Sequence, residues 1–200
     1  MNNRLIYLVV SLVLFCQLPA CTTSLKSQRQ ALHPAIEIRK PDNNFGNPKL
    51  SPPEIMARVL KLIDHAHTRE DLSEESVQNV LGLYMHPNNQ SSDRTIIFSQ
   101  IISSEWRWSV KNYALEEHRI FDFDFVHPDM ITEMTTVCQM DLVQFHNSLL
   151  QMGYQHISSV RSGFYRRQYQ RGDINIDVSY VGEKNELVMH HCVKAVTVEI

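Results

Sequence analysis

The sequence predicts an α+β fold in which a helical hairpin and a further helix pack on an antiparallel sheet. Three segments carry apolar residues at helical spacing, and each helical region is followed by segments of alternating apolar and polar residues. The predicted order is helix, helix, three strands, helix and four strands. A weak similarity between the two halves of this order suggests a duplicated unit.

Capping residues define the two helices of the predicted hairpin. The first is expected over residues 52–67, because Ser51 and Glu54 form a capping box ahead of an apolar stripe. The second is expected over residues 74–81 and ends at Gly82, a residue that readily adopts the left-handed conformation of a helix end. A short connection between them predicts neighbouring, antiparallel helices.

The third helix is expected between Thr136 and Gly153, since Thr136 and Gln139 form a second capping box and Gly153 ends the apolar pattern. Three strands are expected before this helix and four after it, each with apolar residues on one face. The predicted strands are residues 95–102, 106–111, 121–125, 154–160, 164–170, 174–181 and 187–198.

Composition limits the classes of partner. The net charge is -3, and no long block of one charge occurs, so nucleic acid is not an expected partner. A domain of about 150 residues can bury a sufficient core, and no motif in the chain implies a cofactor or a metal.

The N-terminal segment has the features of a targeting sequence. Arg4 precedes an apolar stretch of about fourteen residues, which is shorter than the roughly twenty needed to cross a bilayer. An ordinary secretory signal fits less well, because Leu18 stands where its cleavage site prefers a small residue. The sequence Leu18-Pro19-Ala20-Cys21 resembles the lipobox of bacterial lipoproteins.

This resemblance implies an organisation for the whole chain. Residues 1–20 would be a signal peptide, Cys21 the lipidated first residue, residues 21–50 a flexible tether, and residues 51–200 a single periplasmic domain. Thr22, rather than Asp, follows the cysteine. By the usual sorting rule the protein would be anchored in the outer membrane, facing the periplasm.

The resemblance to a lipobox also assigns a role to each cysteine. With Cys16 in the signal and Cys21 lipidated, Cys138 and Cys192 are the remaining pair in an oxidising compartment, where a disulfide is expected. It would close a loop of roughly fifty residues, worth about 4 kcal/mol by loop-closure entropy. The alternative is a reactive Cys138 thiol near a helix N-terminus.

Two histidine-containing sequences resemble metal ligands by composition alone. Asp64, His65 and His67 lie within four residues, but residues two apart on a helix point in different directions. His190 and His191 are adjacent in a predicted strand and should face opposite sides of the sheet. Neither sequence is expected to chelate a metal.

One group of residues allows a catalytic interpretation. Asp122 and Asp124 lie on the same face of a predicted strand, at a separation of about 6 to 7 Å that suits general acid and base chemistry, and His127 follows. The polar face of an amphipathic strand explains the aspartates equally. No nucleophile elbow, phosphate loop or glycine-rich fingerprint accompanies them.

A second group suggests a binding surface. Tyr and Arg side chains are concentrated in one predicted strand and its turn, and both residue types are enriched at interface hot spots. The candidate partner-binding residues are Tyr165, Arg166, Arg167, Tyr169 and Arg171. The alternative is an ordinary strand with one aromatic face in the core.

The sequence thus predicts a non-catalytic module that binds a protein, either a toxin or an envelope protein. A small tethered lipoprotein without catalytic motifs resembles in type the immunity proteins that neutralise toxins delivered to the periplasm. A structural or assembly accessory lipoprotein is the alternative, and a hydrolase using Asp122, Asp124 and His127 is the third reading.

Overall fold

The computed structural model describes residues 46–88, 95–128, 134, 137–138, 140–162, 164–182 and 191–200. The predicted signal, Cys21 and most of the tether lie outside the described residues, as do Thr136, Gln139 and His190. The described residues belong to one compact unit. None of the helices among them is long and apolar enough to cross a membrane.

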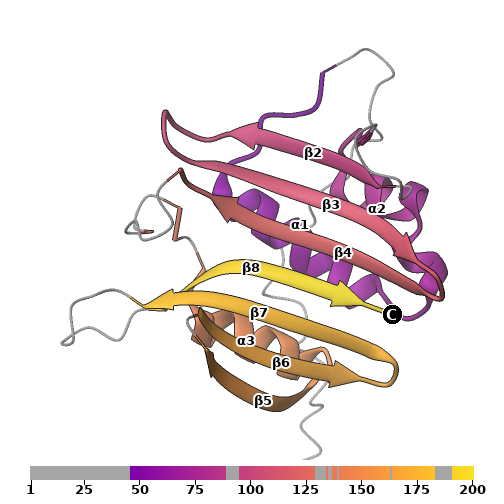
Figure 1. Cartoon of the computed structure of the whole chain (residues 1–200), viewed down its shortest axis with the longest axis vertical. Coiled ribbons are helices and arrows are strands. Elements are labelled where there is room, and N and C mark those ends of the chain that lie inside the picture. The colour runs from indigo at the N-terminus through magenta and orange to yellow at the C-terminus, as the bar shows by residue number, and fades with distance from the viewer. Residues whose placement is uncertain are drawn as a thin grey trace, which may run out of the picture. The chain divides into compact units, whose positions relative to one another are not determined.

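The described strands form one antiparallel sheet of eight strands in the order β1-β2-β3-β4-β8-β7-β6-β5 (Figure 1). They are β1 (His86–Pro87), β2 (Ile96–Ile101), β3 (Arg107–Leu115), β4 (His118–Val126), β5 (Gln155–Ser162), β6 (Phe164–Arg171), β7 (Ile174–Gly182) and β8 (His191–Glu199). Val196 of β8 lies opposite Phe123 of β4 and Val178 of β7. The last strand therefore joins the early strands to the late ones.

This single sheet shows that the predicted fold class is wrong. The sequence predicts a helical hairpin and a further helix packed on antiparallel sheet, with three strands before the third helix and four after it, whereas the protein is dominated by one continuous sheet of eight strands. Alternation along a strand is a local signal, but the pairing of β8 with β4 depends on segments that are distant in the chain. The suggested duplicated unit belongs to this predicted arrangement and is corrected with it.

The helices lie on one face of this sheet (Figure 1). They are α1 (Pro52–His65), the 3-10 turn η1 (Arg69–Leu72), α2 (Glu74–Leu81) and α3 (Leu142–Gln151). The first two α-helices form where the sequence predicts. The Ser51 backbone N–H donates to Glu54 at 2.8 Å, and Gly82 ends α2 with a φ of 61°.

The third helix begins later than predicted. Its cap is Asp141, whose side chain accepts a hydrogen bond from the Val143 backbone N–H, and Cys138 precedes the helix. Asp141 also forms an isolated antiparallel bridge with Cys192 of β8. The extended backbone needed for that bridge is incompatible with a helix at this point.

Side chains of alternate strand residues and of the helices form one core. Asn112 is a polar residue that is buried as a whole, with 2 % exposure, and its Nδ2 donates to the Leu72 carbonyl at 3.0 Å. This bond ties η1 to the middle of β3. The largest apolar residues that fill the core include Ile55, Met56, Leu62, Ile63, Trp108, Phe121, Phe123, Phe125 and Phe145.

Candidate partner-binding site

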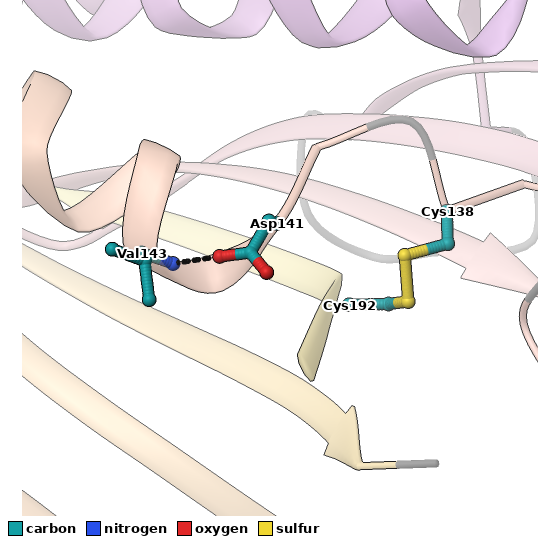
Figure 2. The surroundings of a disulfide bond; sticks show 4 residues. All are labelled: Cys138, Asp141, Val143 and Cys192. Atoms are coloured by element: carbon teal, nitrogen blue, oxygen red, sulfur yellow. Dashed lines mark hydrogen bonds between the residues drawn. A yellow bond between two sulfur atoms is a disulfide. The ribbon is translucent and has the colours of Figure 1, made fainter. Parts of the chain in front are cut away.

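The disulfide predicted from the sequence is present and anchors the segment before α3 (Figure 2). It joins Cys138 to Cys192, whose Cα atoms are 5.3 Å apart. Because both sulfurs are bonded, Cys138 is not the reactive thiol of the alternative reading. The disulfide and the Asp141 bridge together hold the entry to α3 against the beginning of β8.

Three aromatic rings from neighbouring strands meet next to this disulfide. Tyr165 of β6 lies opposite Tyr180 of β7, and their rings are stacked with centroids 5.4 Å apart. The ring of His191, the residue before Cys192, lies 5.3 Å from that of Tyr180. Arg167 places its guanidinium 5.8 Å from the Tyr180 ring centre. We call Tyr165, Arg167, Tyr180 and His191 the aromatic patch.

Solvent reaches the aromatic patch. The Tyr165 side chain is 39 % exposed, and Arg167, Tyr180 and His191 are each partly buried. Tyr165 and Arg167 share the strand face of Tyr169, which packs against α3 through His146, with the two ring centroids 5.7 Å apart. The aromatic patch therefore continues the helix-bearing face of the sheet at a place where side chains stay accessible.

Polar contacts connect Arg167 to α3. The Tyr169 hydroxyl lies 3.0 Å from His146 Nδ1, and the positive charge of Arg167 acts on both groups. Burial lowers the pKa of His146, and the nearby charges of Arg167 and His156 lower it further. The neutral imidazole is thus favoured next to the fixed positive charge of Arg167.

The structure divides the five predicted binding residues among different environments. Tyr165 and Arg167 lie in the aromatic patch, Tyr169 is 1 % exposed in the core, and Arg166 is on the opposite face of β6. Arg171 is at the end of β6 and points to the ends of two helices. Only two of the five residues therefore share an accessible surface.

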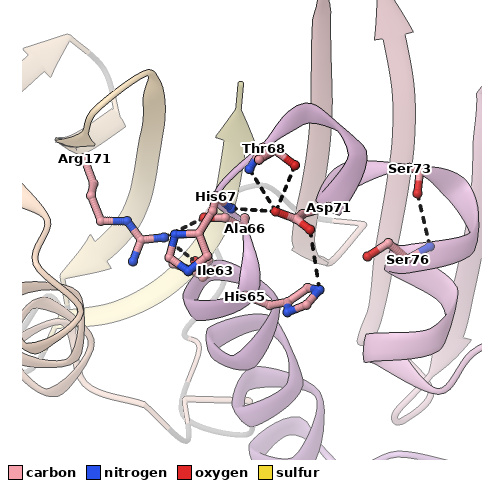
Figure 3. A network of polar contacts seen from close by, with 9 residues as sticks. All are labelled: Ile63, His65, Ala66, His67, Thr68, Asp71, Ser73, Ser76 and Arg171. Carbon is pink, nitrogen blue, oxygen red and sulfur yellow. Dashed lines mark hydrogen bonds and ion pairs between the residues drawn. The ribbon is translucent and has the colours of Figure 1, made fainter.

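The Arg171 side chain makes its contacts with other parts of the fold (Figure 3). Its guanidinium donates to the Ala66 carbonyl at 2.5 Å, to the Ile63 carbonyl at 3.4 Å and to the Met152 carbonyl at 3.0 Å. It also lies 4.4 Å from the Tyr154 ring centre. One side chain thus satisfies carbonyls at the C-terminal ends of both α1 and α3.

The sequence from Asp64 to His67 contributes to a turn at the end of α1 (Figure 3). His65 Nε2 lies 3.7 Å from Asp71 Oδ1, and the His67 backbone N–H donates to Asp71 Oδ2 at 3.0 Å. The His67 backbone bond is the main factor that lowers the pKa of Asp71. Across the residues that the structure describes, no group of three or more His, Cys, Asp or Glu could hold a metal ion.

The residues of the hydrolase reading do not assemble into one site. Asp122 accepts hydrogen bonds from the Tyr113 hydroxyl at 3.1 Å and from the Thr197 hydroxyl at 2.7 Å. Asp124 shares this face of β4, and burial raises its pKa to about 6. His127 packs on the buried Trp106, with ring centroids 4.8 Å apart.

His127 and the two aspartates lie on opposite faces of the sheet. The His127 side chain is only 7 % exposed and lies 3.4 Å from Glu105, on the side of the buried Trp106 and away from the two aspartates. Asp124 Oδ1 is buried and has no hydrogen-bond partner. His127 therefore does not join Asp122 and Asp124 on their face of the sheet.

The sequence does not predict Tyr180 as a site residue, and it considers His191 only as part of a histidine pair that is not expected to bind a metal. The signal that unites them with Tyr165 is the strand register, which local sequence patterns do not reveal. Comparisons with protein-family models, with curated proteins and with solved structures give no match to this chain. The function must therefore be argued from the geometry of the described residues.

Proposed function

We propose that this chain is a lipid-anchored protein of the outer membrane that binds a protein partner in the periplasm without catalysing a reaction. The observation that carries the proposal is the aromatic patch of Tyr165, Arg167, Tyr180 and His191. Tyr provides a large contact area and Arg several hydrogen-bond donors, and both residue types are enriched at interface hot spots.

The rigidity of the aromatic patch supports this proposal. Its side chains come from three paired strands, and the disulfide at Cys192 fixes the strand that carries His191. A preformed surface loses less conformational entropy on binding than a mobile one. The aspartates of β4 do not form an equivalent site, because Asp122 has both oxygens engaged in hydrogen bonds.

The favoured form of this function is an immunity protein that neutralises a toxin delivered to the periplasm. A tether of residues 21–50 attached through lipidated Cys21 would hold the domain at the membrane while the aromatic patch meets its partner. An accessory role in the assembly of an envelope complex is the alternative. The same surface serves both roles, so the identity of the captured protein distinguishes them.

Co-purification from solubilised envelopes tests the proposal. The full chain should retain one partner in stoichiometric amount, and a variant with Tyr165→Ala and Tyr180→Ala should lose it. Tyr84→Ala is the matched control, since Tyr84 is 55 % exposed but belongs to a segment outside the aromatic patch. A secreted toxin as the partner favours immunity, a resident complex favours assembly, and equal capture by all variants would contradict the proposal.

A further inference from the structure

The Arg167 guanidinium has a different environment from those of Arg171 and Arg58. Arg171 is bonded to three backbone carbonyls, and Arg58 donates to the Leu81 carbonyl. Arg167 lies near the Tyr169 hydroxyl and over the Tyr180 ring. Neither of these groups carries a negative charge at neutral pH.

No carboxylate neutralises this arginine within the described part of the chain. The ion pairs found there involve only His65, His118 and His127, none of which is in the aromatic patch. A guanidinium has five N–H donors in a planar fork. Arg167 therefore retains donors that can reach a partner.

The groups around Arg167 favour an anion. Tyr165 and Tyr180 are neutral, while His146, His156 and His191 are either neutral or positive. Asp141, which bridges to Cys192 next to His191, caps α3 by accepting from the Val143 backbone N–H. The accessible surface thus combines a positive centre with an aromatic frame.

We infer that the partner bound at the aromatic patch presents an aspartate or glutamate side chain to Arg167. This inference rests on the proposed function and specifies the chemistry of its partner. A carboxylate matches the fork of a guanidinium and can accept two parallel hydrogen bonds. The Tyr165 and Tyr180 rings reduce contact with water, which strengthens such a pair relative to one at an open surface.

Binding of the co-purified partner to variants of the full chain tests the inference. Arg167→Gln should weaken binding by about 30-fold or more, because the acidic side chain would be left without its counter-charge. Arg167→Lys should recover part of the loss by keeping the charge. Arg166→Gln is the matched control, an exposed arginine on the opposite face that should change affinity by less than about twofold.

Salt provides a second measurement that does not depend on a substitution. Raising sodium chloride from about 0.05 to 0.5 M should weaken the wild-type complex and affect the Arg167→Gln complex much less. If the tyrosine substitutions abolish binding while Arg167→Gln and salt leave it unchanged, the inference is overturned and the proposed function stands. The inference and the proposed function are both overturned if no partner is captured, if capture requires nucleic acid, or if capture survives the loss of Tyr165 and Tyr180.

Discussion

Replacing Arg171 with Leu should cost more stability than replacing any neighbouring exposed arginine. The guanidinium bonds to the Ala66 carbonyl at 2.5 Å and the Met152 carbonyl at 3.0 Å, with a longer contact to Ile63 at 3.4 Å. Hydrogen bonds to charged groups contribute about 1.5 to 3 kcal/mol each. Taking the lower figure for each of the two shorter bonds and about 1 kcal/mol for the contact with the Tyr154 ring, the expected loss is at least about 4 kcal/mol.

The free energy of unfolding can be measured by urea titration of the detergent-solubilised full chain. Trp106 and Trp108 are both buried, at 4 % and 0 % exposure, so their fluorescence reports loss of the core. Arg171→Lys should be intermediate, because an ammonium keeps the charge but not the planar fork.

The matched control is Arg166→Leu, which changes an exposed arginine on the same strand and should shift stability by less than about 0.5 kcal/mol. A loss below about 1 kcal/mol for Arg171→Leu would refute the assignment of Arg171 as the residue that ties α1 to α3. Equal losses for the two arginines would refute it as well.

Three further outcomes are expected. Because burial raises the pKa of Asp124 to about 6, the folded state holds its proton more tightly than the unfolded chain, and stability should fall as the pH rises from about 4 to above 6. In urea titrations at several pH values, Asp124→Asn should remove this decline, and a pH profile unchanged by Asp124→Asn would argue against the buried carboxylate. For comparison, Asp122→Ala should lower the free energy of unfolding by about 1 to 2 kcal/mol through its broken hydrogen bonds. Replacing Cys138 and Cys192 with Ser should lower stability by about 4 kcal/mol, from a separation of 54 residues, and free thiols at both positions in non-reduced peptide maps would contradict the pairing. Cys21→Ala should release the protein from membranes in fractionation experiments, and a variant that stays bound would rule out the lipid anchor.

Features that depend on neighbouring residues could be predicted from the sequence. The Ser51 and Glu54 capping box and the end of α2 at Gly82 are set by interactions within one turn, so the pattern is sufficient to locate them. The disulfide could be predicted because Cys138 and Cys192 are the only two cysteines in the sequence after residue 21.

Features that depend on pairing between distant segments could not be predicted. The contact of Phe123 with Val196 makes one sheet of two groups of strands, and no local pattern encodes it. The bonds of Arg171 to the ends of α1 and α3 could not be predicted, because these helix ends come from other parts of the chain. Tyr180 joins Tyr165 only through the register of β6 and β7.

The central claim is that the aromatic patch contacts a protein partner, and site-specific photo-crosslinking tests it most directly. A photoreactive phenylalanine analogue at Tyr165 should give one discrete crosslinked protein in intact envelopes, while the same analogue at the exposed Tyr84 should not. The same product from both positions, or none from Tyr165, would contradict the claim.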